Sequence, residues 1–181
     1  EKMIEVEVKA RAREDTAEKI ALLGAIPLAV ENHRDLYFNS PRRDFRKSDE
    51  ALRIRIKEGG ARLTYKGPKL DAATKSRREM TVRIDSPEEM QEILQALGFT
   101  LSATVCKRRT KFSFEGAVLA LDEVEGLGRF VEVELAAPEG AAGAEDSYEA
   151  SREKVLSILA RLGLGESFRR SYLELLDVTR Q

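Results

Sequence analysis

The stretch Ile4-Glu5-Val6-Glu7-Val8-Lys9-Ala10-Arg11-Ala12-Arg13 alternates apolar with charged residues along its whole length. Successive side chains of a β-strand point to opposite faces of the sheet, so this period of two predicts a strand with one apolar and one ionised face. The alternation returns in Leu52-Arg53-Ile54-Arg55-Ile56-Lys57. Exposed strand faces usually mix Thr, Ser and Gln with their charges, whereas these faces are dominated by Arg, Lys and Glu.

Turn residues divide the rest of the chain into further strands and helices. Gly59-Gly60 predicts a hairpin onto residues 63–66, and Glu115-Gly116 predicts another hairpin. About eight strands joined mainly by hairpins predict a largely antiparallel sheet in an α+β fold. Residues 41–49 carry four basic side chains, and we expect a mobile surface loop or a lid there. Helices are expected from Asp15, with Glu18 completing a capping box, after the cap residue Ser86, and at about 146–163 and 169–177.

Composition excludes several classes of protein and several kinds of metal site. A length of 181 residues with 42% hydrophobic residues predicts one domain, 1–181, with a sizeable core. The 31 Lys and Arg residues nearly balance the 32 Asp and Glu residues, which argues against nucleic acid as a partner. A single cysteine, Cys106, and a single histidine, His33, exclude a disulfide framework, a zinc-cysteine cluster and a multi-histidine metal site. No apolar run approaches the roughly 20 residues of a membrane span, so we expect a cytoplasmic protein that does not enter the membrane.

The ionised strand faces allow two architectures. In the first, an open sheet packs its apolar face on the helices and leaves its charges in water, and for any single strand this is the better interpretation. In the second, the sheet closes into a barrel with a charged lumen, and helices cover its apolar outside. The dominance of full charges and the need of several amphipathic helices for an apolar surface favour the closed barrel. Its lumen would hold the cations Lys9, Arg53, Arg55, Lys66, Arg77, Lys107 and Arg109 and the anions Glu5, Glu7, Glu79, Asp122, Glu132 and Glu134.

Such a lumen has a defined chemistry. Clustered Arg and Lys side chains repel one another unless an anion lies between them, and they suit a polyphosphate. Clustered carboxylates are relieved by a divalent cation, and without a histidine or cysteine cluster this would be Mg²⁺ or Mn²⁺. The chain contains no Gly-x-x-x-x-Gly-Lys-Ser/Thr sequence, which excludes the P-loop mode of nucleotide binding.

Six motifs in order make the pattern specific. They are Glu5-x-Glu7-x-Lys9, Arg53-x-Arg55, Tyr65-Lys66-Gly67-Pro68, Lys107-x-Arg109, Leu121-Asp122 and Glu132-x-Glu134. Together they resemble the CYTH superfamily, the triphosphate tunnel metalloenzymes, over roughly residues 3–176. Asp35-x-Tyr37-Phe38 and the stretches 49–55 and 127–132 resemble the class IV, CyaB-type adenylate cyclase branch.

The resemblance implies an eight-stranded antiparallel tunnel that binds a triphosphate and Mg²⁺ or Mn²⁺, with a homodimer as an option. Glu79-Met80-Thr81 departs from the Glu-x-Glu that many members carry on the fifth strand, so Glu79 is retained only as an additional metal ligand to test. The resemblance assigns Glu5, Glu7, Glu132 and Glu134 to the metal, with Asp122 nearby, and Lys9, Arg53, Arg55, Lys66, Lys107 and Arg109 to the phosphates. Arg77 joins the phosphate set from the charge pattern, and the expected catalytic residues are Glu5, Glu7, Lys9, Lys107, Arg109 and Asp122.

Three functions fit these expectations. The preferred one is an adenylate cyclase that converts ATP to 3′,5′-cyclic AMP and pyrophosphate. The alternative is a triphosphatase that acts on tripolyphosphate, thiamine triphosphate or a nucleoside triphosphate. A non-catalytic polyphosphate or nucleotide binder is disfavoured, because binding an anion alone needs no acidic cluster. His33 is expected to be structural rather than catalytic, and Tyr172 is expected to pack a helix rather than to close one end of the tunnel.

Overall fold

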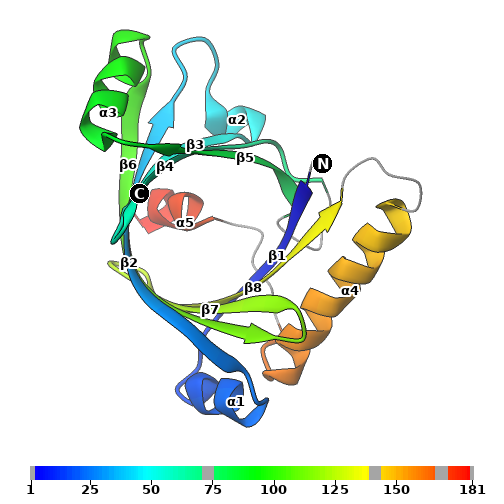
Figure 1. The fold of residues 1–181 in the computed structure, drawn as a ribbon. Coiled ribbons are helices and arrows are strands. Elements are labelled where there is room, and N and C mark those ends of the chain that lie inside the picture. Colours follow the sequence, from blue (N-terminus) through cyan, green and yellow to red (C-terminus); the bar gives the residue numbers. More distant parts are fainter. Residues whose placement is uncertain (1–2, 71–75, 139–143, 166–170, 180–181) are drawn as a thin grey trace.

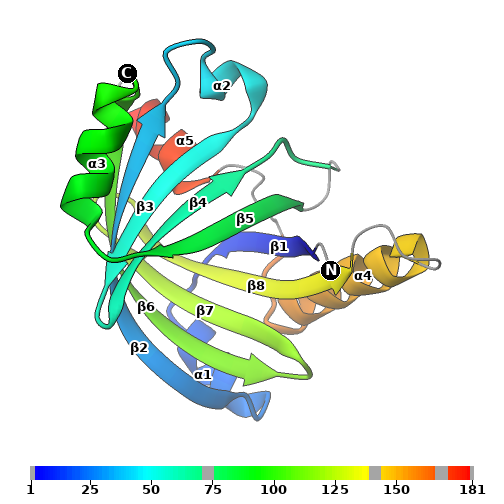
Figure 2. The same ribbon diagram turned by 45° about the horizontal axis from the view of Figure 1, so that its top comes forward.

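The computed structural model describes residues 3–70, 76–138, 144–165 and 171–179, and its strands form a closed barrel (Figures 1 and 2). Eight strands follow one another around the ring in the order β1-β5-β4-β3-β2-β6-β7-β8, and every neighbouring pair is antiparallel. The predicted closed antiparallel barrel is therefore confirmed over the open sheet. The strands are β1 Met3–Arg11, β2 Ile26–Asn39, β3 Ala51–Lys57, β4 Gly60–Lys66, β5 Arg77–Ile84, β6 Thr100–Phe114, β7 Ala117–Val124 and β8 Gly128–Pro138.

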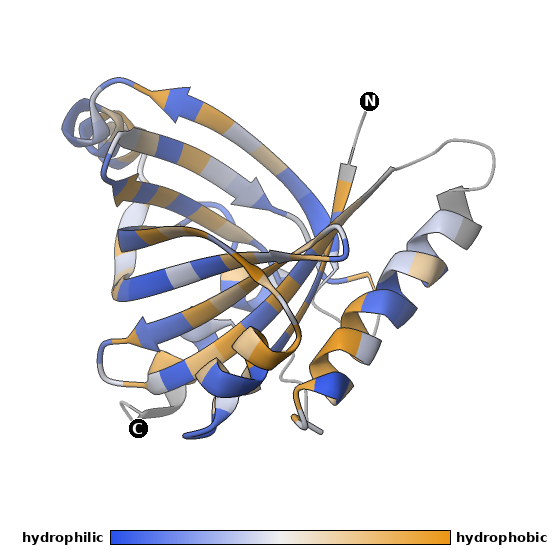
Figure 3. Ribbon diagram, turned by 60° about the horizontal axis from the view of Figure 1, so that its bottom comes forward, coloured by the Kyte–Doolittle hydropathy of each residue, from blue (hydrophilic) through white to orange (hydrophobic). Residues whose placement is uncertain are grey.

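The alternation in β1 sets the inside and the outside of the barrel. Val6 and Val8 are fully buried in an outer core between β1, β8 and a C-terminal helix. Glu7 and Lys9 have the opposite parity, and they pair across the strands with Glu134 and with Glu132 of β8. Figure 3 shows the resulting alternation of hydrophilic and hydrophobic residues along the strands. The ionised faces of the strands thus share the lumen, and the apolar faces are turned outward.

Helices outside the sheet cover part of its apolar surface. The long helix α4 buries Val155 and Ile158 against β1 and β8, and α3 buries Leu94 against Leu36 and Ile54 of the neighbouring strands (Figure 1). None of the helices in the described ranges combines the length and the apolar character that a membrane span needs. The helices are α1 Thr16–Leu22, α2 Phe45–Ser48, α3 Pro87–Ala96, α4 Ala144–Arg161 and α5 Tyr172–Thr179.

Helix α5 lies across one end of the barrel. Its Tyr172 and Leu175 form a buried cluster with Tyr37, Val105 and Phe130, which come from three different strands. In Figure 1 the helix lies within the outline of the strand ring. The last helix therefore covers one end of the lumen with apolar and aromatic side chains. Residues 169–170, where the second C-terminal helix was predicted to begin, lie outside the described residues.

One predicted helix cap needs correction, and another is confirmed. Asp15 forms no side-chain cap on α1, because its backbone (φ −85°, ψ 1°) is not extended and its carboxylate pairs instead with Lys19 at 3.0 Å. The expected capping box with Glu18 is therefore wrong. Ser86 does cap α3, since its Oγ accepts a hydrogen bond of 3.1 Å from the Glu89 amide.

The segment 41–49 is more structured than the predicted surface loop. It contains the short helix α2, which Asp44 caps by accepting a hydrogen bond from the Arg46 amide. Phe45 is only 7% exposed and packs against Phe99, with ring centroids 6.3 Å apart. This aromatic contact packs α2 against the connection between α3 and β6, an effect that the basic composition of the segment did not indicate.

Candidate active site

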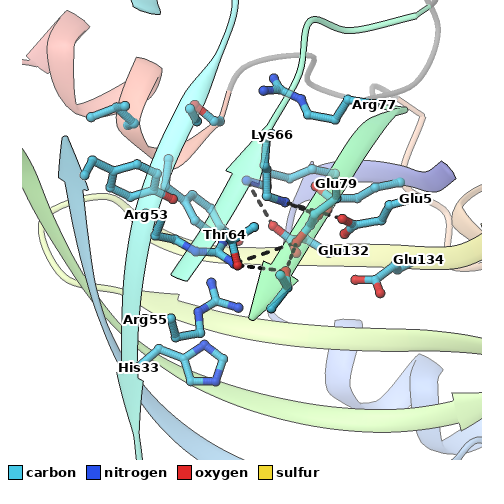
Figure 4. A pocket seen from close by; sticks show the side chains of 18 of the residues that line it. Glu5, His33, Arg53, Arg55, Thr64, Lys66, Arg77, Glu79, Glu132 and Glu134 are labelled. Carbon is cyan, nitrogen blue, oxygen red and sulfur yellow. Dashed lines mark hydrogen bonds and ion pairs between the residues drawn. The ribbon is translucent and has the colours of Figure 1, made fainter. Parts of the chain in front are cut away.

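The barrel encloses a cavity of about 600 Å³ lined by the inward-facing side chains of the strands. Most of the lining is charged, as the alternation in the sequence predicted. Ten of its residues are labelled in Figure 4, which shows carboxylates and cations facing one another across the lumen. The predicted site residues that line this cavity are Glu5, Glu7, Lys9, Arg53, Arg55, Lys66, Arg77, Glu79, Lys107, Arg109, Glu132 and Glu134.

Three carboxylates form an acidic group on one wall. Glu5 and Glu7 of β1 and Glu134 of β8 can each offer an oxygen such that all three oxygens lie within 4.8 Å of one another. Burial, followed by the charges of Glu5 and Glu7, raises the pKa of Glu134 to about 8. This set of oxygen donors fits a hard divalent cation such as Mg²⁺ or Mn²⁺, which would relieve the repulsion that now favours a proton on Glu134.

The other two expected metal residues, Asp122 and Glu132, pair with cations in the structure. Arg109 donates two hydrogen bonds to Asp122, at 2.8 and 2.6 Å, and a third to Glu132 at 2.5 Å. Lys9 lies 3.0 Å from the remaining oxygen of Glu132. Among the described residues, the cluster of Glu5, Glu7 and Glu134 includes neither Asp122 nor Glu132, whose oxygens pair with buried Arg109 and Lys9. Asp122 lies beneath Arg109, with no exposed surface.

Lys66 links the acidic group to the fifth strand. Its Nζ lies 3.4 Å from a Glu5 oxygen and 2.9 Å from a Glu79 oxygen. Thr81, where many relatives were expected to carry a second carboxylate, instead shares a 2.9 Å hydrogen bond with Thr64. Glu79 is consequently held by Lys66 at the edge of the acidic group, and β5 contributes a hydroxyl where a second carboxylate would stand.

The opposite wall is rich in cations, and these differ in how closely a carboxylate pairs with them. Arg55 donates two hydrogen bonds, at 2.8 and 2.7 Å, to the fully buried Asp35. Burial alone would raise the pKa of Asp35, but Arg55 holds this pKa well below its ordinary value. Arg53, 8% exposed, reaches Glu79 only at 4.0 Å, and its Nε has no hydrogen-bond partner among the described residues. Arg53 is therefore the less neutralised of the two guanidinium groups on β3.

Lys107 is a buried cation that an anion would stabilise. It is 6% exposed and lies 3.7 Å from Asp122, whose oxygens also bind Arg109. Burial and then the charges of Arg109 and Arg55 lower the pKa of Lys107 well below its ordinary value. The negative charge of a phosphate bound beside Lys107 would oppose this lowering of the pKa.

Tyr172 contacts charged residues of the lumen, which the sequence analysis did not expect. Its hydroxyl donates a 2.7 Å hydrogen bond to Asp122, and its ring centroid lies 3.2 Å from the Lys9 Nζ and 4.8 Å from the Lys107 Nζ. Besides packing α5, this residue contributes a polar and cation-binding surface to the lumen. The sequence alone gives no signal for these contacts, which depend on where α5 crosses the barrel.

Other lumen residues could have been found by extending the alternation. On β2 the charged or polar positions Glu31, His33 and Asp35 continue the period of two, and Lys57 and Lys111 continue the series of their own strands. Lys57 and Lys111 both pair with Glu31, at 2.9 and 3.5 Å. These residues extend the charged lumen beyond the predicted set.

A closed antiparallel barrel with an acidic group facing buried cations defines a class of tunnel proteins, and comparison with known proteins identifies the family. The profile of the CYTH domain matches residues 3–172, and the chain therefore belongs to the CYTH family. A protein of Methanocaldococcus jannaschii named "Putative adenylate cyclase MJ0240" is 37% identical over 179 residues, which cover 96% of this chain and 98% of that protein.

Solved structures agree with this assignment. The PH1819 protein of Pyrococcus horikoshii is 43% identical, with a TM-score of 0.90 over 97% of this chain and 99% of that one. HpAC1 from Hippeastrum, which carries the name of an adenylyl cyclase and is described with a dominant triphosphatase activity, is 20% identical, with a TM-score of 0.69 over 98% of this chain and 96% of that one. At this identity HpAC1 shows a shared fold.

Proposed function

We propose that this protein is a divalent-metal-dependent enzyme that acts on triphosphates, and that its reaction is the conversion of ATP to 3′,5′-cyclic AMP and pyrophosphate. One observation carries the proposal: Lys107 and Arg53, two buried and incompletely neutralised cations, share a cavity with the group Glu5, Glu7 and Glu134. A binder of anions would need only the cations. The name of the Methanocaldococcus relative supports cyclisation as the particular reaction.

The acidic group would hold the metal. A divalent cation bound by Glu5, Glu7 and Glu134 would neutralise charge on phosphate oxygens and make the ribose 3′-hydroxyl easier to ionise. The protein side chains perform the remaining tasks, namely binding the phosphate chain, orienting it along the lumen and compensating the charge of the leaving group.

The cations would hold the triphosphate and its product. Lys107 and Arg53 have charge to offer a phosphate, since their carboxylate partners lie at 3.7 and 4.0 Å. In the cyclase reaction the 3′-oxygen bonds to the α-phosphorus, the bond from this phosphorus to the bridging oxygen breaks, and the hydroxyl proton leaves. Arg and Lys side chains already positioned around pyrophosphate stabilise the charge that it gains in the transition state.

Hydrolysis of a triphosphate is the second candidate. The predominance of charged side chains in the lining favours it, because a phosphate chain uses such a lining throughout its length whereas an adenine ring does not. HpAC1 shows that this fold occurs in a protein described with triphosphatase activity. Water would then attack the terminal phosphorus in the same lumen.

Product analysis separates the candidates. The protein is incubated with ATP or with tripolyphosphate, each with Mg²⁺ or Mn²⁺ and each with EDTA, and the products are resolved by chromatography. Cyclic AMP and pyrophosphate in equal amounts are the expected result, and they should vanish with EDTA and in Lys107→Met. Lys47→Met, a change at an exposed position of α2, is the matched control and should retain activity. Orthophosphate without cyclic AMP would replace the cyclase by a triphosphatase, and no turnover of either compound would refute both.

A further inference from the structure

His33 is a buried histidine that the proposed reaction does not use. It lies on β2 with the lumen parity, is 4% exposed and lines the cavity beside Arg55 (Figure 4). Its Nε2 lies 2.6 Å from a carboxylate oxygen of Glu31. In the ring order, β2 is four places from β1 in either direction, so His33 faces the lumen from the wall opposite Glu5 and Glu7. The imidazole is thus anchored at one nitrogen within the cation-rich wall.

The protonation of the ring follows from its neighbours. Although burial raises the pKa of Glu31, hydrogen bonds from Lys57 and His33 lower it to about 2, so Glu31 is ionised and Nε2 carries the proton that it donates. Burial and then Arg55, together with Lys107 and Arg109, lower the pKa of His33 to about 4. At neutral pH the ring is therefore neutral, and Nδ1 has a lone pair.

That lone pair is unsatisfied. Within the described ranges of the chain, Nδ1 of His33 is buried and has no hydrogen-bond partner. Buried polar atoms normally have partners, and an exception inside a cavity indicates a group that a ligand completes. The charges of Arg55, Lys107 and Arg109 act on this ring, yet its Nδ1 accepts no hydrogen bond from the described residues.

Charged groups come toward the ring from every neighbouring strand. Both cations and anions lie near the imidazole of His33. An anion that enters the cavity would favour the charged form of this imidazole. The groups are Glu31 and Asp35 on β2, Arg55, Lys57 and the following Glu58 at the end of β3, Lys107, Arg109 and Lys111 on β6, and Asp122 on β7, which binds Arg109 and lies near Lys107.

We propose that His33 is a phosphate-binding residue of the tunnel, which takes up one proton from solvent when a triphosphate enters and then donates a hydrogen bond from Nδ1 to a phosphate oxygen. The inference rests on the proposed function only for the identity of the ligand. A phosphate near Arg55 and Lys107 opposes the charges that keep the ring neutral, and its oxygen is an acceptor that a neutral Nδ1 would repel. Glu31 stabilises the resulting imidazolium at the other nitrogen.

Triphosphate binding should therefore be coupled to protonation of His33. Because the bound ring holds a proton that the free ring lacks, the affinity for triphosphate should rise as the pH falls, by up to tenfold per pH unit between the pKa of the free ring and that of the bound ring. Above the pKa of the bound ring the affinity should become independent of this group.

The single histidine permits a direct test. In ¹⁵N-labelled protein all histidine ring signals belong to His33, and correlation of ring nitrogens with ring protons distinguishes a neutral ring from an imidazolium. Tripolyphosphate in EDTA is the probe, so that no turnover occurs. We expect the free ring to be neutral with its proton on Nε2 above pH 5, and its pKa to rise by at least two units with tripolyphosphate. Lys47→Met, the exposed change on α2, should retain this response.

The outcomes separate the two claims. Tripolyphosphate that binds, as shown by shifts of other signals, while the ring stays neutral would overturn the role of His33 and leave the proposed function intact. Absence of binding at every pH would overturn both. As a second measurement, His33→Gln should bind tripolyphosphate with an affinity that has lost the steep pH dependence, and an unchanged dependence in that variant would also refute the assignment.

Discussion

Replacing Glu134 by Gln tests the acidic group through the stability of the metal-free protein. Burial and the neighbouring Glu5 and Glu7 raise the pKa of Glu134 from 4.5 to about 8. Between these values the folded protein keeps the proton on Glu134, whereas the unfolded chain has lost it. The free energy of unfolding must therefore fall as the pH rises from about 4.5 to about 8.

The size of this loss follows from the pKa. At about 1.4 kcal/mol per pKa unit, a rise from 4.5 to about 8 corresponds to at most about 5 kcal/mol at pH 9. Glutamine keeps the shape of the side chain but has no proton to lose, so Glu134→Gln should remove most of this loss. A loss of that size is comparable to the whole stability of a marginal domain, typically about 5 to 15 kcal/mol.

The assay is guanidinium unfolding at pH 5, 7 and 9, in EDTA and with Mg²⁺ or Mn²⁺. In EDTA the wild type should lose stability toward pH 9, and Glu134→Gln should not. Metal should restore the wild type at pH 9, because the cation replaces the proton, and it should have little effect on the variant. Glu123→Gln, an exposed change on β7, is the control and should behave as the wild type. Parallel pH dependences of wild type and Glu134→Gln in EDTA would refute the reasoning.

Three further substitutions test the opposite wall and the end of the tunnel. Lys107→Met should raise the stability of the ligand-free protein by about 1 kcal/mol or more, because it removes a poorly compensated buried charge, and should weaken tripolyphosphate binding at least about tenfold in calorimetry; equal affinity would contradict its role. Asp35→Asn should cost about 3 kcal/mol in urea unfolding by leaving Arg55 buried without its carboxylate, and a cost below about 1 kcal/mol would contradict the pairing. Tyr172→Phe should cost about 1 to 2 kcal/mol in the same assay, since Asp122 loses a donor, with metal affinity unchanged; a neutral change would show that the hydroxyl bond contributes nothing.

The barrel was predictable because period-two patterns are local. In β1 the residues Glu5, Glu7 and Lys9 reveal by themselves which face is ionised, and the number of charges on such faces was sufficient to favour closure over an open sheet. The same local rule, continued from Asp35 back along β2 through His33, would have placed Glu31 in the lumen.

The partners of each charge were not predictable in the same way. Asp122 and Glu132 look like any other lumen carboxylates in the sequence, but the register of β6, β7 and β8 brings Arg109 between them. Which carboxylate meets a guanidinium and which meets another carboxylate depends on strand stagger and on side-chain reach, and a single sequence fixes neither. The contacts of Tyr172 were beyond prediction for the same reason, since they arise from the path of the chain after α4.

The acidic group joins the first strand to the last. Among the described residues, β1 pairs with β8 through nine residue pairs, from Met3↔Pro138 to Arg11↔Phe130, and with β5 through two. A nascent chain therefore carries Glu5 and Glu7 for most of its synthesis without the carboxylate that completes their group, and the proposed site for a divalent ion would form only after residue 134 has emerged and the ring has shut. Uptake of an ion at this proposed site would report the closure of the ring, before any nucleotide is offered.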